Sequence, residues 1–385
     1  MAAGYVGRIA SDAVTDGDST PIWKEPPVGG YPSPEFFGLP GIDRLRAARD
    51  LKMPIPPIAY LTEMPFRELS IGHAAFEMPA SPWFANSAGV VTGGMLTVLA
   101  DAPLGASIHT QCPPGVAFTT AEISLTFLRP VHADPEVRIS GSGHVIHQGR
   151  SVALSEAFMI NEGTGELVAH GTSRCSMFPP IDPLPEPPDD FPVIDQALPG
   201  SHPTHPLRRP LQGQSLDEEV FEERSGLEII RAQLAGELPV PPLHYLTGIR
   251  PVEVSEGRAT CALPCSPWLS TSFRTVQGGF TAMLGEFAQA SAVFTTAEPG
   301  VAIAPLDLKV NFLRPVYPDL RDLTAEAEVI HRGRQIAISN CRITNADGKP
   351  VALATGSAMY LPGRPASLSG VDQLDSATDG EEGGA

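Results

Sequence analysis

PASPWFANSAGVVTGGMLTVLAD (residues 79–101) is matched 185 residues later by PCSPWLSTSFRTVQGGFTAMLGE (264–286). Each stretch places a Gly-Gly pair at the front of an apolar run that reads as a helix. Each also ends on an acidic residue, eight positions after the first glycine of the pair. Two such matching stretches indicate that the chain contains a duplicated unit.

Further matches extend this repeat in both directions, and the separation stays at 185 residues until one residue is lost in the second copy. The matches are PIPPIAYLT (54–62) with PVPPLHYLT (239–247), FLRPV (127–131) with its copy at 312–316, and VIHQGR (145–150) with VIHRGR (329–334). A separation that stays constant over so many positions identifies the chain as an internal duplication.

Both copies predict the same order of elements. A short amphipathic helix (GIDRLRAARDL; GLEIIRAQLAGEL) precedes a proline-rich turn, short strands follow, and the Gly-Gly helix comes next. Three or four strands complete the unit, which in copy one we place at 120–130, 136–148, 151–162 and 166–177. One long helix followed by antiparallel strands joined by hairpin turns predicts an α+β fold, with the helix packed on a curved sheet.

The repeat also predicts the organisation of the chain. The duplicated units occupy 36–178 and 225–363, and the proline-rich segment 179–224, which lacks periodicity, is expected to be a surface linker. We expect residues 1–35 and the acidic tail 364–385 to be poorly ordered.

Composition limits the classes of function. With 42% hydrophobic and 18% charged residues the chain is typical of globular proteins, and its net charge of −18 argues against a nucleic-acid partner. The odd number of cysteines, five, favours a reducing compartment, and Cys261 and Cys265 have no second Cys/His pair that would complete a metal site. The sequence shows no signal peptide and no membrane-spanning apolar run, so we expect a cytoplasmic protein.

The Gly-Gly helix starts suggest a site for a partial negative charge. The first N–H groups of a helix have no partner within the helix, and the helix dipole adds positive charge there. Glycine lets a ligand approach this backbone, which suits a polarised carbonyl oxygen or an oxyanion. The alternative is that the glycines only permit close packing.

The repeated acids suggest a shared function. Asp101 follows Gly93 by eight residues, and Glu286 follows Gly278 by the same number. A carboxylate near the buried face of an apolar helix costs free energy unless it has a partner or a function. An exposed or hydrogen-bonded acid is the alternative, which the recurrence of the acid in both copies disfavours.

The combination of Gly-Gly with a later acid, FLRPV and VIHxGR resembles the hotdog-fold acyl-CoA thioesterases of the PaaI-like type. The resemblance covers both copies and implies two tandem hotdog domains, paired within the chain, each with a helix wrapped by an antiparallel sheet. It implies that the helix-start glycine amide polarises the thioester carbonyl, while the helix acid acts as general base or nucleophile. An amide seven residues before the glycine is implied to hold substrate or water, and a strand hydroxyl before FLRP to orient the water.

The implied site residues are complete in copy one only, where they are Asn86, Gly93, Asp101 and Thr120. In copy two Gly278 and Glu286 are present, but Thr271 replaces the amide and Pro305 replaces the hydroxyl. The family usually has His directly before Gly-Gly, whereas this chain has Thr92 and Gln277.

The resemblance also implies contacts to coenzyme A. Arg150 and Arg334 correspond to positions near its phosphates, and the second glycines, Gly94 and Gly279, to positions that contact it. A solvated hairpin residue is the alternative for each arginine. Coenzyme A enters as part of the acyl-CoA substrate, so no further cofactor is expected, and we expect the chains to form dimers.

Spacing predicts that the sites are shared between the copies. Eight residues separate glycine and acid by about 12 Å along one helix, too far for both to touch one thioester carbon. We therefore predict two mixed sites, one with Asn86 and Gly93 facing Glu286, the other with Gly278 facing Asp101 and Thr120. The predicted activity is acyl-CoA hydrolysis; a non-catalytic acyl-CoA-binding protein and a hotdog hydratase are the alternatives.

Overall fold

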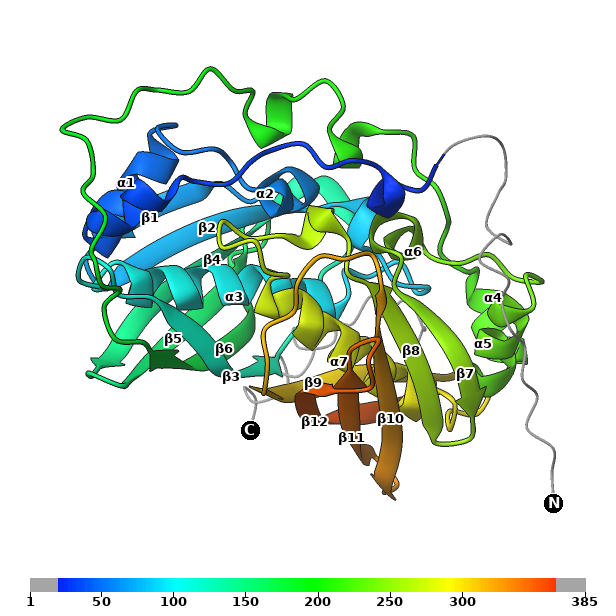
Figure 1. Ribbon diagram of the computed structural model, residues 1–385. Coiled ribbons are helices and arrows are strands. Elements are labelled where there is room, and N and C mark those ends of the chain that lie inside the picture. The colour runs from blue at the N-terminus through cyan, green and yellow to red at the C-terminus, as the bar shows by residue number, and fades with distance from the viewer. Residues whose placement is uncertain (1–19, 365–385) are drawn as a thin grey trace, which may run out of the picture.

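The computed structural model describes residues 20–364 and shows two copies of one α+β unit that share a single twelve-stranded antiparallel sheet (Figure 1). Copy one supplies β1 (Phe66–Ser70), β2 (His73–Ala80), β3 (Phe118–Phe127), β4 (Asp134–Gln148), β5 (Val152–Asn161) and β6 (Glu166–Met177). Copy two supplies β7 (Arg250–Ser255), β8 (Arg258–Pro264), β9 (Val301–Phe312), β10 (Asp322–Arg332), β11 (Ile336–Thr344) and β12 (Pro350–Pro362). The predicted α+β fold with two tandem hotdog domains is confirmed.

The sheet has an internal two-fold relationship. Its strand order is β1-β2-β4-β5-β6-β3-β9-β12-β11-β10-β8-β7, so the second half repeats the first in reverse. The halves join where β3 pairs with β9, and there Ser124 lies opposite Lys309, its own counterpart in the repeat. Because equivalent residues meet at the join, the copies face each other like the subunits of a symmetric dimer.

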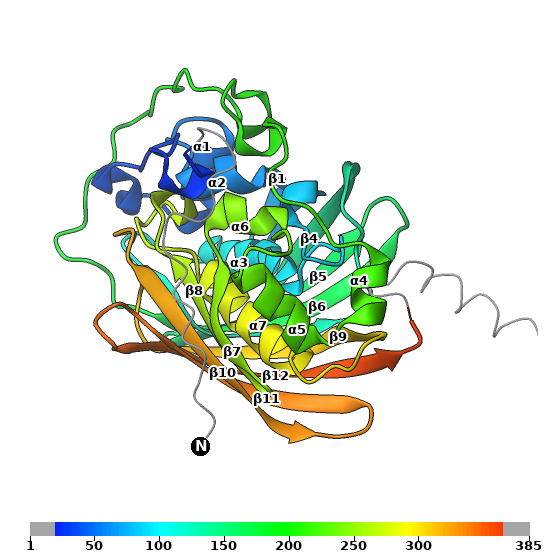
Figure 2. The ribbon, with the colours of Figure 1, turned by 90° about the vertical axis from the view of Figure 1, so that its right-hand side faces the viewer.

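Two long helices, α3 (Gly93–His109) and α7 (Gly278–Phe294), lie in the hollow of the curved sheet (Figure 2). Most of their side chains are buried, as expected of helices that are apolar on all sides. One continuous hydrophobic core surrounds both helices and draws on both copies, including Trp83 and Trp268. The two hotdog domains therefore share one hydrophobic core.

α3 contains Pro103, yet the helix does not end there. α3 runs six residues further, to His109, and matches α7 in length. Strand β4 passes close to this point, and a Cβ on Gly143 would lie 2.3 Å from the Pro103 carbonyl oxygen. The glycine lets the strand approach the helix at its proline.

Short helices cover the mouth of the hollow. They are α1 (Gly41–Arg49) and α2 (Pro57–Thr62) in copy one, with α5 (Gly226–Leu234) and α6 (Pro242–Thr247) as their counterparts. The predicted amphipathic helix before each proline turn is confirmed by α1 and α5. In α5 it begins with a capping box in which Ser225 and Glu228 satisfy each other's backbone N–H groups.

Residues 20–35, which we expected to be poorly ordered, instead pack on both copies, and the Gly30 N–H donates to the Ile55 carbonyl of copy one at 2.9 Å. Ile22 in the 3₁₀ helix η1 (Ile22–Lys24) is buried in the shared core. The backbone carbonyl of Glu25 accepts a hydrogen bond from the Trp268 indole N–H at 3.1 Å. The tails 1–19 and 365–385 lie outside the described residues, and so does most of the predicted acidic tail.

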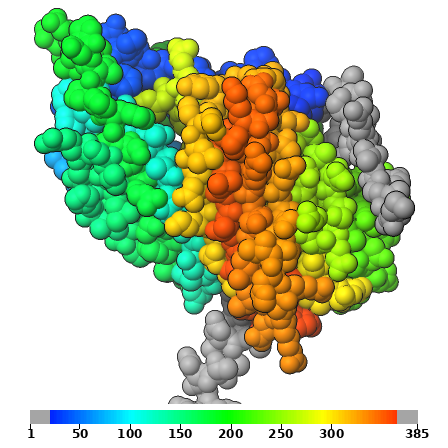
Figure 3. Space-filling view, turned by 60° about the horizontal axis from the view of Figure 1, so that its bottom comes forward, coloured from blue at the N-terminus to red at the C-terminus, as the bar shows by residue number. Residues whose placement is uncertain are grey.

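The linker 179–224 is mostly irregular, with short turns η4 (Pro199–Ser201), η5 (Pro206–Arg208) and α4 (Glu218–Glu223). It crosses over copy one before it reaches copy two (Figure 1). Phe191 stacks on Phe36, in η2 (Pro34–Gly38), with ring centroids 3.8 Å apart. The outward face of the sheet is not covered by these segments, and Figure 3 shows the strands of both copies side by side across it.

Candidate active site

Helices α3 and α7 cross in opposite directions at their Gly-Gly starts. A Cβ on Gly94 would lie 2.3 Å from Met283 Cγ, and one on Gly279 would lie 2.7 Å from Val98 Cα. Only glycine fits at these distances, so the second glycine of each pair allows the helices to touch. The alternative that the glycines permit close packing therefore holds for Gly94 and Gly279, and the elements they bring together are the two helices.

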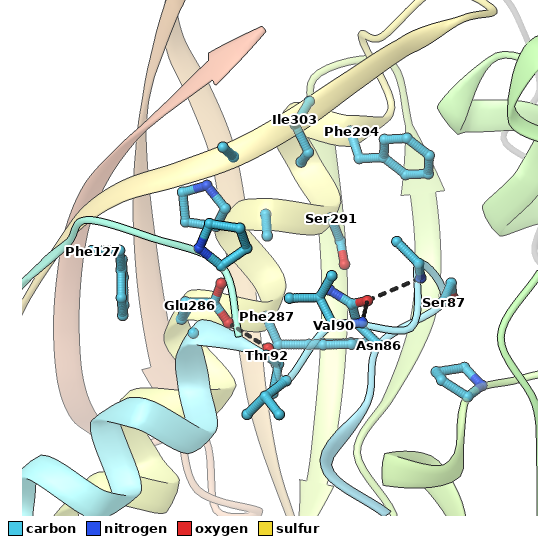
Figure 4. A pocket seen from close by; sticks show the side chains of 18 of the residues that line it. Asn86, Ser87, Val90, Thr92, Phe127, Glu286, Phe287, Ser291, Phe294 and Ile303 are labelled. Atoms are coloured by element: carbon cyan, nitrogen blue, oxygen red, sulfur yellow. Dashed lines mark hydrogen bonds between the residues drawn. The ribbon is translucent and has the colours of Figure 1, made fainter. Parts of the chain in front are cut away.

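This crossing brings each acid to the start of the other copy's helix. Glu286 is 5% exposed, and its Oε2 accepts hydrogen bonds from the Gly94 N–H and the Thr92 hydroxyl, both at 3.2 Å (Figure 4). Glu286 thus lies where the dipole of α3 stabilises negative charge. The mixed pairing predicted from the spacing is the geometry that the structure shows.

The second mixed site repeats this arrangement with fewer hydrogen bonds. Oδ2 of Asp101 accepts a hydrogen bond from the Gly279 N–H at 3.0 Å. Gln277, the counterpart of Thr92, instead donates to the Val98 carbonyl at 3.4 Å. Asp101 therefore receives a backbone donor but no donor from the residue that precedes Gly-Gly.

Burial raises the pKa of both carboxyl groups. The pKa of Glu286 rises to about 7, mainly by desolvation, although the hydrogen bonds from Thr92 and Gly94 oppose the rise. Desolvation raises the pKa of Asp101 to about 6 against the opposing bond from Gly279. A carboxylate with a pKa near neutrality is suited to take up and return a proton at physiological pH.

The first glycines are arranged differently from the second. A Cβ on Gly93 would lie 3.3 Å from Glu286 Oε1, and one on Gly278 would lie 3.3 Å from Asp101 Oδ2. Within residues 20–364 neither glycine's N–H donates a hydrogen bond, as expected at the first position of a helix. The N–H groups of Gly94 and Gly279 donate to the carboxylates, and the predicted contact of these glycines with coenzyme A stays a prediction.

A cavity of about 280 Å³ opens beside Glu286 and Gly93. Its walls are mainly apolar, and they come from the start of α3, the FLRPV loop, the C-terminal half of α7 and the beginning of β9. Phe287, Phe294 and Ile303 form part of the copy-two side (Figure 4). Such a space accepts an apolar group with its reactive end at the carboxylate.

Asn86 lines the same cavity. Its side-chain oxygen accepts hydrogen bonds from the N–H groups of Ala88 at 2.9 Å and Val90 at 3.3 Å, which fixes the loop before α3. These bonds determine the orientation of the carboxamide, so its NH₂ group remains available as a donor. Asn86, Gly93 and Glu286, which were predicted to form one mixed site, therefore line the same cavity.

Thr120 and Pro305 lie at the positions that the repeat assigns to them. Pro305 lines the cavity beside Glu286, so that site has no strand hydroxyl. Thr120 lies in β3 opposite Cys175 of β6, and Cys175 is within electrostatic reach of Asp101. The hydroxyl and the carboxamide therefore belong to different sites.

The arginines predicted to bind phosphates do not reach the cavity. Arg150 and Arg334 are exposed in the hairpins β4–β5 and β10–β11 and are not among the described residues that line it. Arg129 of FLRPV does line it and pairs with Glu166 at 3.0 Å. In the sequence Arg129 stands at a strand end before Pro130, which favours a structural interpretation, so its place in the cavity wall was not predicted.

The copy-two walls of the cavity were also missed. Phe287, Phe294 and Ile303 lie one, eight and seventeen residues after Glu286, and the first two share its helix. Phe287 and Phe294 are seven residues apart and so lie on one face of α7, and this spacing is a usable signal for the pocket wall once a mixed site is predicted around Glu286.

The described part of the chain gives no sign of a metal or a membrane segment. Residues 20–364 contain no group of three or more His, Cys, Asp or Glu side chains arranged to bind a metal ion. No helix among them is both long and apolar enough to cross a membrane. All five cysteines are buried and free.

Comparison with known proteins places the repeat in a family. The thioesterase superfamily matches the chain twice, at residues 88–168 and 273–352. Human acyl-coenzyme A thioesterase 13 is 26% identical over 102 residues, which are 26% of this chain and 69% of that protein. Acyl-coenzyme A thioesterase PaaI of Escherichia coli is 27% identical over 116 residues, 30% of this chain and 80% of that protein.

A solved structure is similar over a longer range. A putative thioesterase from Novosphingobium aromaticivorans covers 74% of this chain and 95% of its own, with 15% identity and a TM-score of 0.47. The two matches to the superfamily fall on the two hotdog domains and include Gly93, Asp101, Gly278 and Glu286. The chain therefore contains two hotdog domains of the thioesterase superfamily in tandem, and it is a thioester hydrolase.

Proposed function

We propose that the chain hydrolyses acyl-CoA thioesters, with Glu286 as general base and the Gly93 N–H as oxyanion donor. The observation that carries this proposal is that Glu286 and Gly93, from different copies, line one apolar cavity. The similarity to acyl-coenzyme A thioesterases supports coenzyme A as the thiol part of the substrate. The apolar walls favour an apolar acyl group.

The reaction follows from the donors and acceptors at the site. Both hydrogen bonds to Glu286 end on Oε2, which leaves Oε1 to accept a proton from water. The water oxygen attacks the thioester carbon while Glu286 takes the proton, and the carbonyl oxygen gains negative charge beside the Gly93 N–H. The carbon–sulfur bond then breaks, and the thiolate recovers the proton from Glu286 as it leaves.

Asn86 has a supporting role in this proposal. Its NH₂ group faces the cavity from the loop before α3 and donates to the substrate carbonyl or to the attacking water. Arg129, at the cavity wall and only partly buried, is suited to contact the coenzyme. Arg150 and Arg334 stay predictions for the coenzyme A phosphates.

The test is release of free thiol from a panel of acyl-CoAs by the wild type, Glu286→Gln and Asp101→Asn. We expect Glu286→Gln to lower kcat at least about 100-fold, the usual contribution of a general base. Unchanged activity in both variants would overturn the proposal. Binding without thiol release would favour an acyl-CoA-binding protein, and hydration of an enoyl-CoA would favour a hydratase.

We also propose that the protein works in the cytoplasm as a dimer of such chains. Five cysteines that are buried and free of disulfide bonds support a reducing compartment. The oligomeric state is measured by sedimentation or light scattering of the full chain.

A further inference from the structure

The two mixed sites differ in the side chains that form their walls. Ala88, Phe294 and Ile303 line the cavity beside Glu286. Their counterparts in the repeat, 185 residues away, are Phe273, His109 and Phe118 at the Asp101 site. The exchange of Ala88 for Phe273 replaces a methyl group with an aromatic ring at the same place in the loop before the helix.

At the Asp101 site these three rings pack in a row, with His109 between Phe273 and Phe118. Phe273 stacks on His109 with ring centroids 6.0 Å apart, and His109 meets the edge of Phe118 at 5.9 Å. Phe37, from η2, packs against Phe273 at 6.0 Å. The rings thus occupy the space that corresponds to the open cavity beside Glu286.

The Glu286 site has no equivalent ring in its mouth. Phe294, the counterpart of His109, has Phe221 as its ring neighbour at 6.3 Å, and Phe221 is itself part of the cavity wall. Ala88 carries only a methyl group and leaves the space between the loop and Phe294 open. Among the exchanged wall residues, the pair Ala88 and Phe273 is therefore the one that replaces a methyl group with a ring in the loop before the helix.

Neighbouring contacts fix Phe273 in place. Its N–H donates to the Thr271 hydroxyl at 3.2 Å, and the next residue, Arg274, lies over the Tyr31 ring at 4.5 Å. Phe37 is in turn covered by the Arg44 guanidinium at 5.3 Å. Phe273 remains 45% exposed, as expected of a side chain that closes a mouth rather than one that belongs to the core.

We infer that Phe273 closes the acyl cavity of the Asp101 site, so that each chain binds one acyl-CoA, at Glu286. This inference rests on the proposed function for its choice of ligand. It explains why the two acids occupy equivalent positions in the repeat and yet differ in their surroundings, with an open cavity beside Glu286 and packed rings at the Asp101 site. Phe273 is a specificity-determining residue in this sense, because it decides which of two similar sites admits substrate.

The test counts bound ligand with a probe that cannot be hydrolysed, an S-alkyl thioether of coenzyme A, by isothermal titration calorimetry. We expect one probe per chain for the wild type and two for Phe273→Ala. The matched control is the reciprocal exchange, Ala88→Phe, which should close the Glu286 site and abolish binding. Two probes per wild-type chain, or one per Phe273→Ala chain, would overturn the inference.

An activity measurement separates this inference from the proposed function. Glu286→Gln combined with Phe273→Ala should release thiol at least about tenfold faster than Glu286→Gln alone, because Asp101 becomes able to act as a base. Adding Asp101→Asn should remove the gain. If the stoichiometry rises from one to two but no variant releases thiol, the proposed function fails and the closure by Phe273 stands. If thiol release depends on Glu286 but Phe273→Ala changes neither the stoichiometry nor the rate of thiol release, the proposed function stands and the closure by Phe273 fails.

Discussion

The Glu286 carboxylate accepts a hydrogen bond from the backbone N–H of Gly94, at 3.2 Å and across 192 positions of the chain. The equivalent bond runs from copy two to copy one, where the Asp101 carboxylate accepts a hydrogen bond from the Gly279 N–H at 3.0 Å. Each Gly-Gly helix therefore begins against the acid of the other copy, where its dipole stabilises the charge. Neither copy contains a complete site by itself.

The rate of hydrolysis should depend on the ionisation of Glu286. Burial raises the pKa of this carboxyl to about 7, and a general base must be ionised to act. We expect kcat/KM to fall about tenfold per pH unit below about pH 7 and to level off above it. The measurement is thiol release at constant ionic strength; a midpoint near the pKa of about 6 of Asp101 would identify that acid as the base instead.

Thr92 should tune this pH dependence. Its hydroxyl donates to Glu286 Oε2 at 3.2 Å and stabilises the ionised form. Thr92→Val keeps the shape but removes the donor, so the midpoint of the kcat/KM profile should rise by about one pH unit, the equivalent of one hydrogen bond to a charged group. A profile that keeps its midpoint would show that this hydrogen bond has no effect on the base. Thr97→Val is the control, because Thr97 donates to the Gly93 carbonyl and not to the acid.

Glu286 should also lower stability above neutral pH. The folded chain keeps the proton on this carboxyl up to a higher pH than the unfolded chain, whose ordinary value is 4.5, so stability falls as the pH rises through this window. Glu286→Gln has no proton to lose. Its free energy of unfolding relative to the wild type should therefore increase by about 3 kcal/mol between about pH 4 and pH 8. Urea unfolding measures this, and a difference that is constant with pH would contradict the assignment.

The mixed sites could be predicted from the sequence because the repeat fixes two distances. Gly93 and Asp101 are too far apart on one helix to share a thioester carbon, and Gly278 and Glu286 stand in the same relation. With two similar halves, the exchange of acids between helices was the simplest geometry. The strand hairpins followed from turn residues, which are local signals, and the two tandem hotdog domains followed from the resemblance to a family.

The unequal sites could not be predicted, because they depend on contacts between distant segments. Position 273 reads as an ordinary loop residue until Phe37 and His109 are seen to lie against it. Residues 20–35 have the composition of a tail, yet Ile22 and Glu25 pack on the second copy about 240 positions away. The composition of a segment does not indicate which distant part of the chain it packs against.

Gly94 should be irreplaceable at the crossing of the two helices. A Cβ there would lie 2.3 Å from Met283 Cγ and 3.1 Å from its Cα, so α7 would have to move and Glu286 with it. We expect Gly94→Ala to lower the free energy of unfolding by about 1–3 kcal/mol and to reduce kcat. Gly105→Ala in the same helix is the control, since the nearest atom to its Cβ is 3.8 Å away. Gly105→Ala should be neutral or stabilising by about 0.5–1 kcal/mol, and equal losses in the two variants would refute the packing argument.

Asn86 combines two functions that different substitutions separate. Its side-chain oxygen accepts from the N–H groups of Ala88 and Val90, and its NH₂ group faces the cavity. Asn86→Asp keeps the acceptor and loses the donor, so the loop should stay intact and Tm nearly unchanged. With no donor and a second negative charge beside Glu286, kcat should fall at least about tenfold.

Asn86→Ala removes both functions. It should lower Tm as well as kcat, because the Ala88 and Val90 N–H groups lose their acceptor and the loop before α3 is released. The two variants are compared by thermal unfolding and by thiol release. If Asn86→Asp keeps wild-type kcat, the carboxamide only holds the loop, and Gly93 is left as the donor to the substrate carbonyl. If both variants lose kcat but only Asn86→Ala loses stability, the NH₂ group takes part in the reaction.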